Sequence, residues 1–154
     1  MPSEREEALS NIAEARRELL AAIEALSDEQ LSKEGCVGEW AAKDVLSHIA
    51  SWDEVCAQDF RRLARGDGPA LVAFKLDRVD EYNATIMSLR RHFPAAQARR
   101  ELEAGRAELL EVAQGLPDAQ FAQGRFVRGL LDIAAHHDRD HAQMVHDWRQ
   151  QQGL

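Results

Sequence analysis

Residues 130–148, LLDIAAHHDRDHAQMVHDW, decide the fold of this chain. The positions that set their period recur at steps of four, three, four, three and four, and are Leu130, Ala134, His137, His141, Met144 and Trp148. Such steps follow one face of an α-helix. The stretch therefore predicts a helix over about residues 126–151, with two histidines on its inward face.

Working outward, the rest of the chain shows the same period. We predict helices over about residues 3–26, 41–65 and 76–93, and helical spacing that continues to about residue 115. Pro94 interrupts the last of these, so one kinked helix and two separate helices both remain open. Ser3 with Glu6, and Ser27 with Gln30, have the spacing of capping boxes, the second opening a short helical turn.

No segment alternates apolar and polar residues with period two, as a half-buried strand would. We therefore predict an all-α protein: a four-helix bundle with short extra helical turns in the connections, formed by residues 1–154 as a single domain. A chain of this length with 45% hydrophobic residues can bury an adequate core.

Composition excludes several function classes. The 27 acidic and 19 basic side chains give a formal net charge of −8, which disfavours nucleic-acid binding. The most basic cluster, residues 90–100, is followed directly by Glu101 and Glu103. No apolar run approaches the roughly 20 residues that span a bilayer. Two cysteines, Cys36 and Cys56, and no secretory leader predict a cytoplasmic protein. An inert thiol is the expectation for Cys36, with a reactive one as the alternative.

The histidine pair carries the strongest chemical signal. His137 and His141 lie four residues apart on the apolar face, and each unpaired buried imidazole would cost roughly 1–3 kcal/mol. A metal ion would satisfy both, because a pair at this spacing presents two nitrogens on one side of a helix. A buried polar network without metal is the alternative.

His48 is the best third ligand. It lies at the edge of the inward stripe of residues 41–65, which comprises Val45, Ile49, Trp52, Cys56, Phe60 and Leu63. Taken alone, such a histidine is more often a rim or core residue. Three neutral imidazoles would leave the ion open positions for water or a thiolate, and would suit zinc or nickel, with cobalt or iron as further candidates. His92 follows two arginines beside Pro94, His136 lies on the flank of the inward face of its helix, and His146 falls off that face.

Further residues qualify as neighbours of that site. Asp44, one turn before His48, could accept the N–H of its imidazole, although a solvated surface carboxylate is the alternative. Trp52 and Asn83 are pocket candidates, with core or surface roles as the alternatives.

The run GEWAAKDVLSHIASW, residues 38–52, resembles the second-helix signature of the DinB-like superfamily. Residues 80–83 and 130–148 resemble later parts of the same family, particularly of its ClbS/DfsB-type branch. The sequence departs from that pattern at Ala41, where a serine or threonine cap is usual, and in the order His-Asp-Arg-Asp-His of residues 137–141.

The resemblance implies a four-helix bundle, often a homodimer, with a metal triad that falls on His48, His137 and His141. It also implies a range of activities, including thiol-dependent transferases and metal-dependent hydrolases. We therefore expect a metal-dependent enzyme that activates a low-molecular-weight thiol or water against a small electrophile, in detoxification or stress response. A non-catalytic metal-binding or interaction bundle with a structural role is the alternative.

Overall fold

The computed structural model describes residues 1–70 and 78–154, and within them every regular element is helical. The elements, in chain order, are α1 (Glu4–Ile23), α2 (Asp28–Leu31), α3 (Ala42–Ala64), α4 (Val79–Arg90), α5 (Ala95–Gln114), the 3-10 helix η3 (Asp118–Phe121) and α6 (Phe126–Gln152). The predicted all-α fold is confirmed, and α2 and η3 are the extra turns expected in the connections.

Local sequence signals explain most helix boundaries. Ser3 and Glu6 form a complete capping box at α1, and Ser27 and Gln30 form another at α2. Pro94 lies just before α5, so α4 and α5 are two separate helices rather than one kinked helix. Leu76, the predicted start of the helix over residues 76–93, lies outside the described residues.

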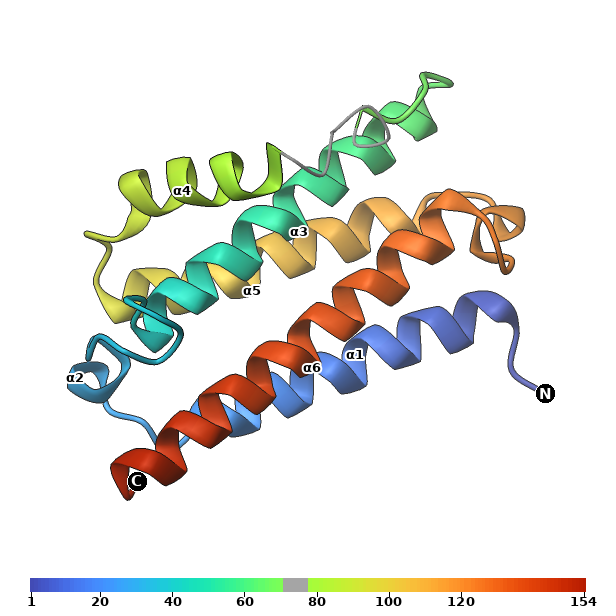
Figure 1. The fold of residues 1–154 in the computed structure, drawn as a ribbon. Helices are drawn as coiled ribbons and strands as arrows, with labels where there is room; N and C mark the ends of the chain where they lie inside the picture. Colours follow the sequence, from blue (N-terminus) through green and yellow to red (C-terminus); the bar gives the residue numbers. More distant parts are fainter. Residues whose placement is uncertain (71–77) are drawn as a thin grey trace. The chain divides into compact units, whose positions relative to one another are not determined.

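The helices form two compact units. The first comprises residues 1–45 and 117–154, and its core is the contact between α1 and α6. These two helices lie side by side and run in the same direction (Figure 1). Contacts in chain order show the same parallel arrangement, from Glu4 with Gln123 to Arg149 with the carbonyl of Ala22.

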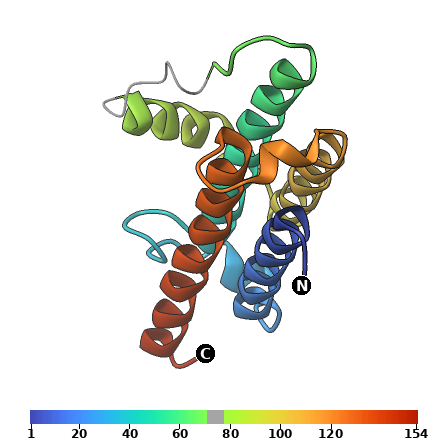
Figure 2. The same cartoon turned by 90° about the vertical axis from the view of Figure 1, so that its right-hand side faces the viewer.

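The second unit comprises residues 46–116, and in it α3 lies between α4 and α5 (Figure 1 and Figure 2). α3 and α5 also run in the same direction (Figure 1), and they approach closely at Gly105. A Cβ atom there would lie 3.2 Å from the carbonyl oxygen of Ala50. A larger residue at this position would have to push the two backbones apart.

Burial along α6 follows the predicted face with one correction. Leu130, Ala134, His141 and Trp148 are buried, but Met144 is 42% exposed and Val145 is buried in its place. The buried face is centred farther round the helix, toward Leu131, Asp138 and Ala142, so Met144 lies at its edge. None of the helices in the described residues combines the length and apolar character needed to cross a membrane.

Candidate metal centre

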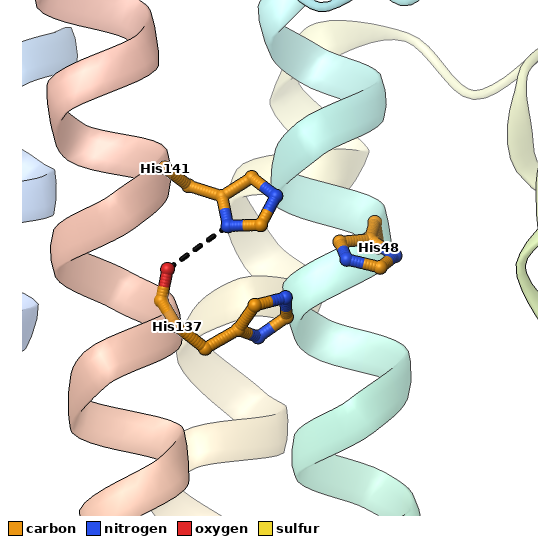
Figure 3. A group of neighbouring side chains, drawn as sticks. All are labelled: His48, His137 and His141. Atoms are coloured by element: carbon orange, nitrogen blue, oxygen red, sulfur yellow. Dashed lines mark hydrogen bonds between the residues drawn. The ribbon is translucent and has the colours of Figure 1, made fainter. Parts of the chain in front are cut away.

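The histidine pair on α6 has a defined internal geometry. The rings of His137 and His141 lie 4.4 Å apart between centroids and are nearly perpendicular, at 88°. His141 is buried and His137 is half-buried. The Nδ1 atom of His141 lies 2.9 Å from the carbonyl oxygen of His137 (Figure 3).

That contact determines the tautomer of His141. A carbonyl oxygen can only accept a hydrogen bond, so Nδ1 must carry the proton and donate it. In the neutral ring, the lone pair then lies on Nε2. A backbone acceptor for one ring nitrogen is the usual way in which a histidine is oriented to bind metal through the other.

Electrostatics favour the neutral ring. Burial lowers the pKa of His141, because a charged imidazole loses hydration there. The hydrogen bond to His137 and the charges of Asp140 and Asp138 act in the opposite direction and do not cancel the effect of burial. A neutral ring is the form that binds metal.

His48 comes from α3 and is also buried, with 6% of its surface exposed. Contacts of Asp44 stabilise the first turn of α3, one turn before His48. Asp44 Oδ2 accepts a hydrogen bond from the backbone N–H of Ala41 at 2.9 Å, and Asp44 Oδ1 accepts one from Lys43 Nζ at 2.8 Å. Asp44 is buried, so the solvated-carboxylate alternative is wrong. Asp44 supplies half of a capping box at the position where Ala41 lacks a capping side chain.

Trp52 follows His48 by one helical turn on the same side of α3, and α4 immobilises it. Its Nε1 donates to Asn83 Oδ1 at 3.0 Å, and its ring packs against Tyr82 with centroids 4.7 Å apart. Tyr82 in turn donates to the carbonyl oxygen of Ser51 at 3.3 Å. Trp52 and Asn83 are therefore direct partners of each other.

His48, His137 and His141 each offer one nitrogen, and these three nitrogens lie within 4.8 Å of one another (Figure 3). Two nitrogens bound to one ion at about 2.0–2.1 Å lie roughly 3.3–4.2 Å apart. Modest side-chain rotation would bring the three to an ion, so the donor set fits a divalent metal. His92, His136 and His146 are all exposed, and His136 instead contacts Asp140 at 3.1 Å.

Sequence reasoning missed two buried ion pairs. Arg16 of α1 donates to Asp138 of α6 at 2.9 and 3.2 Å, and Arg106 of α5 donates to Asp53 of α3 at 3.0 and 3.2 Å. All four side chains are at most 10% exposed. A signal was present, since each residue falls on the inward face that its apolar neighbours define.

Comparison with known proteins gives a family and a fold. The family model described as the DinB superfamily matches residues 11–145. The crystal structure of an uncharacterised protein from Escherichia coli UTI89 is similar, with a TM-score of 0.82 and 13% sequence identity. The similarity covers 100% of this chain and 97% of that chain. No curated protein matches the chain.

Proposed function

The chain belongs to the DinB superfamily, and on that premise we propose that it is a metal-dependent enzyme whose ion is bound by His48, His137 and His141. The observation that carries the proposal is the hydrogen bond from His141 Nδ1 to the carbonyl of His137. It places the lone pair of the neutral His141 ring on Nε2, and each of the three imidazoles offers one nitrogen within 4.8 Å of the others.

Three neutral ligands suit a catalytic ion better than a closed structural one. Histidines add no negative charge, so a zinc or nickel ion keeps its full charge and can lower the pKa of a thiol or of water. The reaction we propose is attack by a low-molecular-weight thiol, or by water, on a small electrophile. Detoxification or a stress response is the corresponding cellular role.

Residues of α6 and α3 have separate roles in the proposed site. His141 is held in one tautomer by the backbone, and His137 is the least buried of the three ligands. Trp52, fixed by Asn83 and Tyr82, offers a rigid apolar surface one turn from His48. We infer that this ring contacts the apolar part of the substrate.

The decisive test is metal content in protein purified without an affinity tag. We expect near-stoichiometric zinc or nickel in the wild type and its loss in His48→Ala, His137→Ala and His141→Ala. His136→Ala is the matched control, because His136 is exposed on the same turn of α6 and should leave metal content unchanged. A wild type that stays metal-free after reloading would refute the proposal.

Catalysis is tested separately on metal-loaded protein. Turnover of 1-chloro-2,4-dinitrobenzene with 2-mercaptoethanol should be stimulated by the protein and abolished by a chelator. The alternative, a non-catalytic bundle with a structural ion, is favoured by the burial of both His48 and His141. It predicts that chelation lowers the melting temperature while no thiol-dependent turnover is detected at any metal loading.

We also propose that the protein is a cytoplasmic homodimer, as the family resemblance implies. Sedimentation at micromolar concentration would test the dimer directly. A single species with the mass of one chain would contradict it.

A further inference from the structure

The ligand-bearing turn of α6 also carries the buried ion pair between Arg16 and Asp138, hereafter the Arg16–Asp138 clamp. Asp138 follows His137 directly and precedes His141 by three residues, and its side chain is fully buried. Arg16 Nε donates to Oδ2 at 2.9 Å and Arg16 Nη2 donates to Oδ1 at 3.2 Å. The pair is therefore bidentate and joins α1 to α6 at the level of the histidines.

The other hydrogen bonds between α1 and α6 involve half-buried or exposed side chains, such as those of Arg139 with Asn11 and Glu18 and of Arg149 with the carbonyl of Ala22. The buried apolar residues of α1 are Ala8, Ile12, Ala15, Leu19 and Ile23. On α6 they include three alanines, Ala134, Ala135 and Ala142. Apolar contact is not directional, so small side chains tolerate rotation of one helix on the other. A bidentate guanidinium–carboxylate pair does not, because its two hydrogen bonds define both angle and position.

Rotation of α6 would be costly for a metal site. An imidazole nitrogen extends about 6 Å from the helix axis, so a rotation of about 10° displaces it by about 1 Å. Metal–ligand distances tolerate about 0.2 Å. Asp138 lies about 60° around the helix from His141 and 100° from His137, so it fixes the rotation without occupying the site.

We propose that the Arg16–Asp138 clamp is a positioning device for the metal ligands: it sets the rotation of α6 so that the nitrogens of His137 and His141 converge. This inference rests on the proposed metal site. It assigns Arg16 and Asp138 as positioning residues that touch neither metal nor substrate. The buried ion pair between Arg106 and Asp53, hereafter the Arg106–Asp53 clamp, sets the rotation of α3 in the same way, and α3 carries the single ligand His48.

The test separates positioning from stability. In the double variant Arg16→Met/Asp138→Leu, apolar side chains of similar length replace the ion pair. Such replacements are often neutral or stabilising, because the cost of burying two charges disappears. A purely structural clamp would then leave metal binding unchanged. A positioning clamp predicts at least a tenfold weaker zinc affinity at an unchanged melting temperature.

Zinc affinity is measured by competition with a chromophoric chelator, and coordination by the absorption spectrum of the cobalt-loaded protein. Arg106→Met/Asp53→Leu should weaken zinc binding less, because one ligand rather than two is displaced. Ile12→Val, in the same α1–α6 interface but outside the clamp, should lower the melting temperature without changing zinc affinity. Should the double variant fail to fold, Arg16→Lys serves instead, since it keeps the charge and loses the bidentate fork.

The outcomes are distinguishable. Wild-type affinity and an unchanged cobalt spectrum in folded Arg16→Met/Asp138→Leu, or in Arg16→Lys if that double variant does not fold, would overturn the positioning role and leave the metal site standing. A wild type that binds neither zinc nor cobalt would overturn the metal site itself, and the positioning role with it. Weaker zinc binding with an altered cobalt spectrum in a variant of wild-type stability supports the proposal.

Discussion

The α1–α6 pair and the α3–α5 pair are built on the same pattern of buried positions. Buried residues of α1 and α5 recur at identical spacing: Ala8, Ile12, Ala15, Arg16, Leu19 and Ile23 in the first, and Ala98, Leu102, Gly105, Arg106, Leu109 and Ala113 in the second. In both pairs the arginine of this series binds a buried aspartate on the partner helix.

The partner helices match as well. Buried positions on α6 are Leu130, Leu131, Ala134, Ala135, Asp138, His141, Ala142 and Val145. At the same spacing, α3 buries Val45, Leu46, Ile49, Ala50, Asp53, Cys56, Ala57 and Phe60. In this alignment His137 and His141 stand where α3 has Trp52 and Cys56. The shared positions pack parallel helices, and His137 and His141 are two of the three proposed metal ligands.

The largest expected effect tests whether the two clamps are equivalent. Arg16→Ala and Arg106→Ala each leave a buried aspartate without its arginine, and each should lower the free energy of unfolding by about 3–5 kcal/mol. Urea denaturation measures this. Arg17→Ala, at a mostly exposed neighbour of Arg16, should stay within about 0.5 kcal/mol of the wild type. A large loss in only one clamp variant would break the equivalence.

Stabilisation by zinc should depend on His141 of α6 and not on Cys56, the matching residue of α3. Zinc at 100 times its dissociation constant stabilises a protein by about 2.7 kcal/mol, if only the folded state binds it. We expect the resulting rise in melting temperature to vanish in His141→Ala and to persist in Cys56→Ala, the matching position on α3. Persistence in both variants would show that ligands outside the histidine pair hold the ion.

Alkaline conditions should affect the α3–α5 pair. Burial, followed by the charges of Asp53 and Asp59, raises the pKa of Cys56 from 9.0 to about 12. The folded state therefore keeps a proton that the unfolded state loses above about pH 9. Stability should fall by about 1.4 kcal/mol per pH unit from there toward pH 12. Cys56→Ala should flatten this slope in urea denaturation at pH 9–11, and an unchanged slope would contradict the assignment.

A smaller effect concerns the closest approach of α3 and α5. Gly105 of α5 stands where α1 has Ala15, and an alanine there gains up to about 1 kcal/mol of helix propensity. Its Cβ, however, would lie 3.2 Å from a backbone oxygen, which cannot move without its helix. We expect Gly105→Ala to lower stability by about 1 kcal/mol, and a stabilised variant would show that the interface yields.

The smallest effect is expected at acid pH in the metal-free protein. Burial lowers the pKa of His141, so below about pH 6.5 the imidazole is protonated in the unfolded state while it stays neutral in the folded state. Stability should therefore decline as pH falls through this window. Replacing His141 with Gln should make denaturation less pH-dependent between pH 7 and 5, whereas His136→Gln, at an exposed position, should not.

Helix content and most boundaries followed from the sequence because their causes are local. Capping pairs such as Ser3 with Glu6, and the break at Pro94, act within one turn. The histidine pair was predictable for the same reason, since residues four apart share one side of any helix. The role of Asp44 was not, because its burial and its contact with Lys43 depend on packing around α3.

By itself the sequence determined which side of each helix is apolar, and it placed Arg16, Asp53, Arg106 and Asp138 on those sides. Only the tertiary structure decided which arginine meets which aspartate. Periodicity specifies the direction in which a side chain leaves its own helix. A partner on another helix, such as Asp138 for Arg16, depends on how the two helices pack, and no local pattern encodes that distance.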